Sequence, residues 1–135
     1  MIIKKIIFVD DEEDLRILMK LYCKKYNKIF ENDNCKIEPL FFLSPIDVID
    51  YFKCNCNELD RICHVVTDID MPLMNGIELV TFLKNEYNFT ECSIVSANDI
   101  NNYKGFVANK PLGFFHKPID YKLFIESVIP YCLGK

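Results

Sequence analysis

The sequence predicts an α/β fold in which helices cover both faces of a parallel β-sheet. Two observations support this class. Short apolar runs of strand length alternate along the chain with segments whose apolar residues recur at helical spacing. No repeat or linker divides the 135 residues, which is the length of one domain. We therefore expect a single domain over residues 1–135, with its core at about residues 4–132 and no output domain.

The composition is that of an ordinary globular domain, with 50% hydrophobic and 27% charged residues. A formal net charge of -4 disfavours a nucleic-acid surface, because phosphate binding requires a basic footprint. No stretch approaches the roughly 18 apolar residues of a membrane span. The seven cysteines are odd in number and lack a secretory signal, so free thiols in a reducing cytoplasm are expected. Neither nucleic acid nor a membrane is an expected partner.

The first predicted strand and helix meet at a cluster of acids. Residues 4–9 form an apolar run that ends at Asp10 and Asp11, and the next apolar residues recur at helical spacing through Tyr26. The acids at 12–14 suit the first turn of this helix, because carboxylates favour the positive end of the helix dipole.

The second predicted pair begins with the apolar run at residues 37–43. Pro39 within this run favours an edge strand, because proline cannot donate a ladder hydrogen bond. Ser44 then predicts a helix cap, since a proline follows it at the first helical position. We expect the buried face of this helix to consist of Ile46, Ile49 and Phe52. Residues 53–60 are expected to form a polar loop.

The third predicted strand delivers an acid to a loop. Val65 and the residues after it form an apolar run to Asp68, and the chain then breaks at Pro72 and Gly76. A helical stripe follows and ends near Asn85. Asp68 therefore lies where a buried strand meets a loop, which is a typical position for a site residue in a parallel sheet.

Two further strands are expected in the remaining sequence. Residues 92–97 form the fourth, and residues 113–117 form the fifth. In the segment 98–112 the asparagines, Gly105 and Pro111 all discourage a helix, so we expect a short or irregular helix there. A last helix is expected from about Asp120, and Pro130 should end or kink it, because its ring clashes with the preceding turn.

Polar side chains follow four of the five predicted strands. Asp10 and Asp11 follow the first, Asp68 ends the third, Ser96 closes the fourth and Lys117 ends the fifth. Three carboxylates that meet at one sheet edge would repel one another unless a cation joined them. Carboxylate oxygens suit a hard divalent ion such as Mg²⁺, which leaves coordination positions open for phosphate oxygens. A carboxylate nucleophile, a metal, a lysine and a hydroxyl together predict a phosphoryl site.

These motifs resemble those of the receiver domain of two-component response regulators, specifically its single-domain, chemotaxis-regulator-like form. The residues that carry the resemblance are Val9-Asp10-Asp11-Glu12, Thr67-Asp68-Ile69-Asp70-Met71-Pro72-Leu73-Met74-Asn75-Gly76, Ile94-Val95-Ser96-Ala97 and Phe114-Phe115-His116-Lys117-Pro118. The resemblance implies a doubly wound, flavodoxin-like sheet of five parallel strands in the order 2-1-3-4-5. The stretch between Asp11 and Asp68 is longer than is usual in this family, and residues 27–36 and 53–61 are expected to carry the excess.

The same resemblance implies roles residue by residue. Asp68 matches the aspartate that accepts a phosphoryl group from phosphohistidine, with Mg²⁺ as the cofactor. The implied metal ligands are Asp10, through water, Asp11, Asp68 and the backbone carbonyl of Asp70. The implied switch residues are Ser96, with Ala97 beside it, and Phe114. Lys117 matches the lysine that pairs with the phosphate, and the side chains of Asp70 and Asn98 are expected to tune hydrolysis.

The predicted function is a phosphorylation-dependent signalling switch. A sensor histidine kinase or a phosphotransfer protein would load Asp68, and the altered surface would bind a downstream protein target. Such a protein assists its own phosphotransfer and dephosphorylation and is not a turnover enzyme.

Other functions compete with this hypothesis. A phosphatase of the haloacid-dehalogenase type has an Asp-X-Asp motif like Asp68-Ile69-Asp70, but it carries that motif on its first strand. It also needs metal-binding acids after its lysine, and Asp120 follows Lys117 too closely to serve as one. A receiver-like interaction module that is never phosphorylated is a third hypothesis, which the intact acids disfavour.

A zinc site on Cys54, Cys56, Cys63 and His64 lacks the usual ligand spacing, and His64 and His116 are interpreted as structural or solvated.

Overall fold

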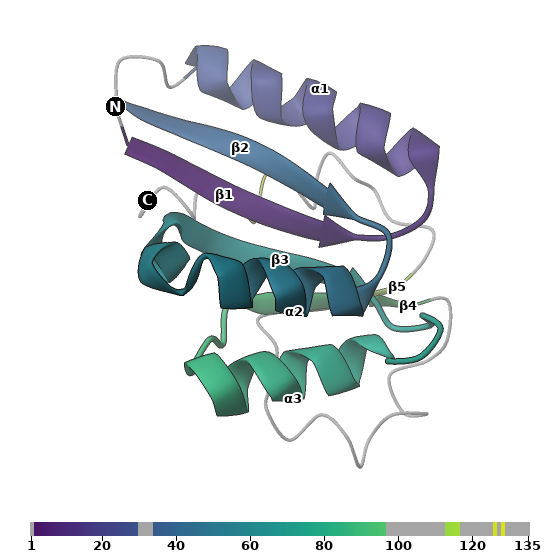
Figure 1. The fold of residues 1–135 in the computed structure, drawn as a ribbon. Helices are drawn as coiled ribbons and strands as arrows, with labels where there is room; N and C mark the ends of the chain where they lie inside the picture. Colours follow the sequence, from purple (N-terminus) through teal and green to yellow (C-terminus); the bar gives the residue numbers. More distant parts are fainter. Residues whose placement is uncertain (1, 30–33, 97–112, 117–125, 127, 129–135) are drawn as a thin grey trace.

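A computed structural model describes residues 2–29, 34–96, 113–116, 126 and 128 (Figure 1). In chain order the elements are β1 (Ile2–Val9), α1 (Glu13–Ile29), β2 (Cys35–Phe42), α2 (Pro45–Cys54), the 3₁₀-helix η2 (Cys56–Arg61), β3 (Ile62–Asp68), α3 (Gly76–Tyr87), β4 (Cys92–Ser96) and β5 (Gly113–His116). Strands and helices alternate from β1 to β4, as the sequence predicts.

The strands form one parallel sheet in which β1 lies between β2 and β3, and β4 lies beside β3. The predicted parallel α/β architecture is confirmed, and so is the order β2-β1-β3-β4. β5 pairs with β4, also in parallel, with His116 opposite Ser96 in register. All carboxyl ends of these strands therefore point to one edge of the sheet.

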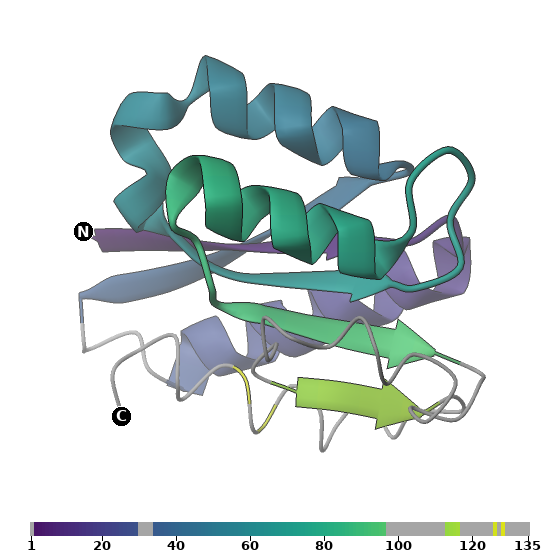
Figure 2. The ribbon, with the colours of Figure 1, turned by 90° about the horizontal axis from the view of Figure 1, so that it is seen from below.

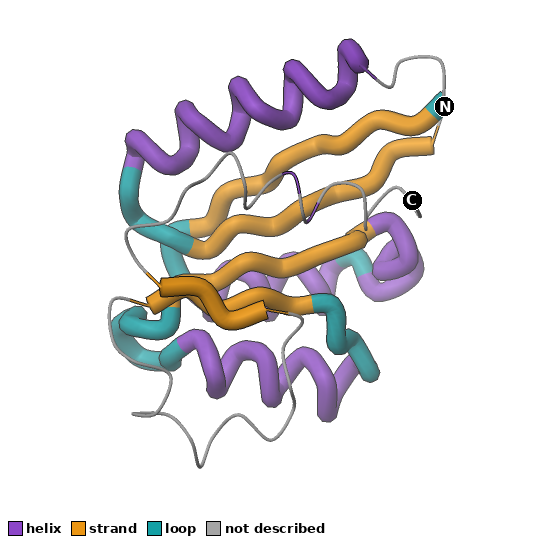
Figure 3. The backbone as a smooth tube through the Cα atoms, turned by 180° about the vertical axis from the view of Figure 1, so that it is seen from behind, coloured by secondary structure: helices purple, strands orange, loops and turns teal. Residues whose placement is uncertain are grey.

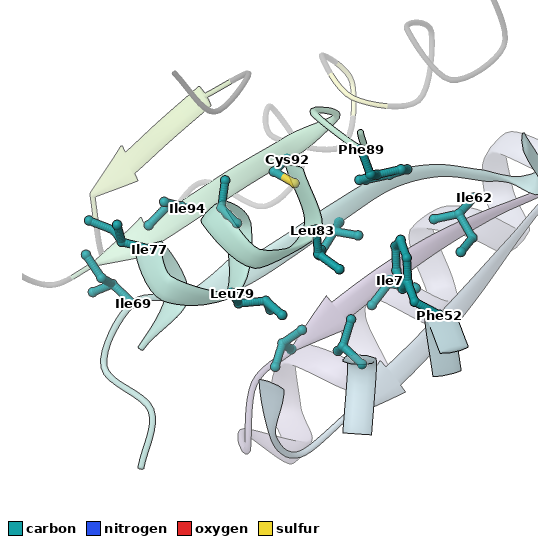
Figure 4. Close-up of a cluster of buried hydrophobic side chains, with 14 residues drawn as sticks. Ile7, Phe52, Ile62, Ile69, Ile77, Leu79, Leu83, Phe89, Cys92 and Ile94 are labelled. Atoms are coloured by element: carbon teal, nitrogen blue, oxygen red, sulfur yellow. The ribbon is translucent and has the colours of Figure 1, made fainter. Parts of the chain in front are cut away.

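Helices cover both faces of the sheet, as predicted. α1 lies against one face, while α2 and α3 lie together on the other (Figures 2 and 3). Because side chains alternate along a strand, β1 contributes to both cores. Ile6 and Phe8 pack on the side of α1, whereas Ile7 and Val9 pack on the side of α2 and α3. Figure 4 shows the larger core, in which Phe52 of α2 and Leu83 of α3 meet Ile7.

The helix starts follow the predicted capping chemistry. Ser44 caps α2, with its side-chain oxygen accepting the N–H of Asp47 and Pro45 at the first helical position. The predicted buried face of α2 is wrong at Ile46, which is 39% exposed. Pro45, Val48 and Phe52 share the buried stripe instead. Since these residues lie at i, i+3 and i+7, the neighbouring Ile46 is rotated away from the core.

Residues 53–60, expected to form a polar loop, continue α2 to Cys54 and then form η2. The side-chain and backbone N–H groups of Asn55 both donate to the carbonyl of Tyr51, at 2.8 and 3.0 Å, and close the last turn of α2. The carbonyl of Asn55 then accepts the N–H of Glu58 at 2.9 Å, which starts the next turn. Local hydrogen bonds thus order a stretch that has little apolar patterning.

The prediction that β2 is an edge strand is confirmed, and its free edge is capped by a side chain. The carbonyl of Phe42 accepts the N–H of Asp10, the residue after β1, so by alternation the backbones of Ile37 and Pro39 face away from β1. Asn27 of α1 accepts the outward N–H of Ile37 at 2.7 Å and donates to its carbonyl at 2.8 Å. Pro39 has no N–H to offer. Both features oppose the addition of another strand.

Candidate functional site

The candidate site lies at the carboxyl ends of the strands, where β1 and β3 are adjacent. Val9 pairs with Thr67 in register, so Asp10 and Asp68 are the next residues on two hydrogen-bonded strands. Opposed residues on neighbouring strands lie about 5 Å apart, so two acids are held together at this exit. The predicted meeting of the first and third strands is therefore present in the fold.

Asp10 and Asp11 have different environments. Asp10 is 8% exposed, and its Oδ1 accepts the backbone N–H of Glu12 at 3.0 Å, which holds the turn between β1 and α1. Asp11 is exposed. Glu13 and Asp14 occupy the first turn of α1, as predicted, where the helix dipole favours their charge.

The Asp68 carboxylate is half-buried at the end of β3 and also organises the loop that follows. Its Oδ1 accepts the backbone N–H of Asp70 at 3.2 Å, while the side chain of Asp70 is exposed. The hydroxyl of Thr67, which is fully buried, donates to the carbonyl of Asp68 at 2.9 Å. The backbone on both sides of Asp68 is thereby held by local hydrogen bonds.

Helix α3 starts directly against this backbone. A Cβ on Gly76 would lie 2.6 Å from the carbonyl oxygen of Asp68, which is closer than any side chain allows. The Gly76 N–H also donates to the carbonyl of Ile69 at 3.0 Å. Asn75 and Glu78 form a reciprocal capping box, with hydrogen bonds of 2.8 and 3.1 Å between each side chain and the other residue's backbone N–H. These contacts fix where the loop leaves Asp68.

Ser96 ends β4 and is fully buried. Val95 pairs with Asp68, so Ser96 lies one residue beyond the acid on the neighbouring strand. Phe114 lies in β5, opposite Ile94. Three predicted residues, Ala97, Asn98 and Lys117, fall outside the described residues.

The residue types at this exit match the ligand chemistry of Mg²⁺. Asp10 and Asp68 lie at the exits of adjacent strands, exposed Asp11 follows Asp10, and carboxylate oxygen is the ligand atom that Mg²⁺ prefers. Within the described part of the chain, no three His, Cys, Asp or Glu side chains already form a cluster that could hold a metal ion. Mg²⁺ is usually bound by one or two carboxylates together with waters and phosphate oxygens, so such a cage is not a requirement for it.

Many solved structures share this fold. A response regulator receiver protein from Pseudomonas putida superposes with a TM-score of 0.72 and 20% identity, covering 93% of this chain and 95% of the other. The receiver domain of an HD-domain-containing protein from Pseudomonas fluorescens gives a TM-score of 0.76 at 11% identity, covering 99% and 90%. The chain has the receiver-domain fold.

Proteins named stress response regulator protein 1 also resemble the sequence. Stress response regulator protein 1 of Candida tropicalis is 31% identical over 62 residues, which are 44% of this chain and 24% of that protein. The protein of the same name from Candida dubliniensis is 26% identical over 111 residues, 80% of this chain and 33% of that protein. The chain thus spans a third or less of the length of these relatives. No protein-family model matches it.

Two features of this receiver-fold site were missed in the sequence. The Asn75-X-X-Glu78 spacing is a capping-box pattern that would have located the start of α3. The close approach of Gly76 to the Asp68 carbonyl has no sequence signal, since it depends on how α3 packs on β3.

Among the described residues, no helix is both long and apolar enough to cross a bilayer.

Proposed function

We propose that the chain is a phosphorylation-dependent signalling switch that accepts a phosphoryl group on Asp68 from the phosphohistidine of a sensor histidine kinase or a phosphotransfer protein. The observation that supports this most strongly is the register of β1 and β3, which makes Asp10 and Asp68 neighbours at the exit of the sheet. Ser96 ends the next strand, one residue beyond the register position of Asp68.

The reaction is a transfer of the phosphoryl group from nitrogen to oxygen. A carboxylate oxygen of Asp68 attacks phosphorus, the bond to the donor imidazole breaks, and its electron pair returns to the ring nitrogen. Asp68 is only half-buried, so part of the residue reaches the surface from which a donor would approach. When bound, Mg²⁺ would neutralise charge on the transferred group, held by Asp10 through water, Asp11, Asp68 and the carbonyl of Asp70.

The remaining residues of the proposal respond to the phosphate. In this scheme the Ser96 hydroxyl binds a phosphoryl oxygen, with Ala97 leaving room for its movement, and Phe114 changes rotamer. In the proposed sheet order 2-1-3-4-5, β5 lies beside β4, and Lys117, the residue after His116 in the chain, would pair with the phosphate. The side chains of Asp70 and Asn98 tune hydrolysis, and the altered surface binds a downstream protein.

The competing phosphatase hypothesis is disfavoured by topology. Asp68 ends the third strand of the chain, whereas a haloacid-dehalogenase-type enzyme carries its nucleophile on the first. The receiver fold itself is generally that of a signalling switch, not a turnover enzyme.

Intact-mass spectrometry tests the proposal directly. The full chain is incubated with Mg²⁺ and acetyl phosphate, beside Asp68→Asn and a control, Asp60→Asn, which removes an exposed acid in η2. We expect a labile single-phosphate adduct on the wild type and the control, and none on Asp68→Asn. No adduct on the wild type would favour a passive module, and rapid multiple turnover of phosphate esters would favour a phosphatase.

We also expect Lys117→Ala to accept phosphate but to signal poorly, and normal downstream signalling by that variant would exclude the role given to Lys117.

A further inference from the structure

Leu73, in the loop that follows Asp68, combines an unfavourable backbone with an exposed apolar side chain. Its side chain is 93% exposed and its φ is 71°. The N–H of Met74 donates to the carbonyl of Pro72 at 2.8 Å, so Leu73 is the central residue of a γ-turn with positive φ. This is the rarer and more strained of the two γ-turn forms. A residue with a Cβ is unfavourable in this position.

The loop around Leu73 is anchored on both sides. Met71 and Met74 are half-buried and pack against the core under α2 and α3. The Met71 N–H donates to the carbonyl of Ile69 at 3.2 Å, and the Gly76 N–H donates to the same oxygen at 3.0 Å. Figure 2 shows this loop, between β3 and α3, arching out beyond the carboxyl edge of the sheet. Leu73 is therefore held outward by a loop with a defined shape.

Residue choice at the other positive-φ positions gives a contrast. Among the described non-glycine residues, φ is positive at Asn34, Leu73 and Asn88. Asparagine tolerates this conformation, because its short side chain can bond to the local backbone. The leucine side chain cannot form such a hydrogen bond, and at 93% exposure it contributes little to the core. Strain of this kind is concentrated at ligand clamps and other functional sites.

We propose that Leu73 is a specificity residue for the protein phosphodonor, whose surface has an apolar recess beside the phosphohistidine to receive it. This inference rests on the proposed phosphorylation of Asp68, which lies five positions earlier in the chain. Burial of the leucine in the recess removes it from water and is independent of the transfer chemistry. A small phosphodonor has no such surface, so it does not use Leu73.

Charge around Leu73 restricts the donor further. Asp70 is exposed in the same loop, and Glu12, Glu13 and Asp14, which follow the proposed metal ligand Asp11 after the adjacent strand β1, are exposed acids. A donor that docks on this edge therefore requires basic residues around its apolar recess, because like charges across an interface oppose binding. The partner of this surface is a protein with an apolar recess and a basic rim, and not a second acidic surface such as another copy of this edge.

The test compares two phosphodonors on the full-length chain. One is acetyl phosphate with Mg²⁺, and the other is a histidine phosphotransfer protein, selected from a panel of such proteins as the fastest donor to the wild-type chain and loaded with ³²P on its histidine. The variants are Leu73→Gly, which suits the backbone and removes the side chain, and Leu73→Met, which restores an apolar side chain. The control is Ile29→Asn, which replaces an exposed apolar residue at the far end of α1.

We expect Leu73→Gly to lose at least tenfold in the rate of transfer from the protein donor and to keep the wild-type rate with acetyl phosphate. Leu73→Met should recover most of the loss, and Ile29→Asn should match the wild type with both donors. Leu73→Gly should also unfold at the same or a higher urea concentration than the wild type, which separates lost docking from lost folding.

Equal transfer from the protein donor to Leu73→Gly and the wild type would overturn the inference. So would an equal loss of rate in Leu73→Gly with acetyl phosphate and with the protein donor, since the leucine would then act on the reaction site and not on the docking of a protein. Failure of the proposed function has a different signature, in which neither donor labels the wild type at Asp68.

Discussion

Acid should destabilise the fold through His64, a buried side chain in β3. His64 is fully buried, and its Nε2 lies 2.6 Å from the Ser93 hydroxyl in β4. Among the described residues, no hydrogen-bonding group contacts its Nδ1. Protonation would place a positive charge in this low-dielectric environment with one nitrogen unsatisfied. Burial therefore lowers the pKa of His64 from 6.5 to about 4.

The direction of the pH effect follows from the two pKa values. Above pH 6.5 the histidine is neutral in both the folded and the unfolded states, and it makes no pH-dependent contribution. As pH falls below 6.5, the unfolded chain takes up a proton that the folded chain excludes, so the free energy of unfolding decreases. The decrease should be about 1.3 kcal/mol between pH 7.5 and 5.5, and about 3 kcal/mol once pH falls below the folded pKa.

Urea unfolding of the wild type and His64→Gln, measured at several pH values from 7.5 to 5.5, tests this. Glutamine can still hydrogen-bond to Ser93 but does not titrate. The carboxylates and His116 are common to both proteins, so the difference between their pH profiles isolates His64. The range stops above the sequence pI of about 5.2, because a protein near zero net charge tends to associate. Parallel profiles for the two proteins would refute the reasoning.

Three further substitutions test other contacts. Gly76→Ala should lower the free energy of unfolding by about 1 to 3 kcal/mol, measured by urea unfolding, and should slow labelling by acetyl phosphate, because the new Cβ displaces the Asp68 carbonyl. Asn75→Ala should cost about 1 kcal/mol through loss of the capping box, without a comparable effect on labelling. Asn27→Ala should cost about 1 to 2 kcal/mol and produce concentration-dependent association in sedimentation velocity, because it uncovers the edge of β2.

Each of these has an outcome that would contradict it. Wild-type stability of Gly76→Ala would mean that α3 can shift without penalty. If Asn75→Ala slowed labelling as much as Gly76→Ala, the cap and not the close approach would position Asp68. A monomeric Asn27→Ala at high protein concentration would show that Pro39 and the twist of the edge suffice to block pairing.

Most of the fold was predictable because its signals are local. Alternation of apolar runs with helical stripes indicated the parallel sheet, and the proline in β2 indicated its edge position. The acids after the first and third strands could be placed at one sheet edge, since parallel strands share their carboxyl ends. The polar stretch 53–60 was misread because η2 is held by hydrogen bonds around Asn55, which leave no apolar period.

The sequence by itself determined which residues are available for chemistry: an acid at the end of each of two strands, a hydroxyl at the end of a third, and the helix caps between them. Only the tertiary structure decided how they meet. The register of β1 and β3 brings Asp10 beside Asp68, and the packing of α3 makes glycine necessary at position 76. The exposure and positive φ of Leu73 likewise depend on a loop anchored at both sides of it. These properties depend on contacts between residues distant in the chain or on the path of a whole loop, which no local pattern records.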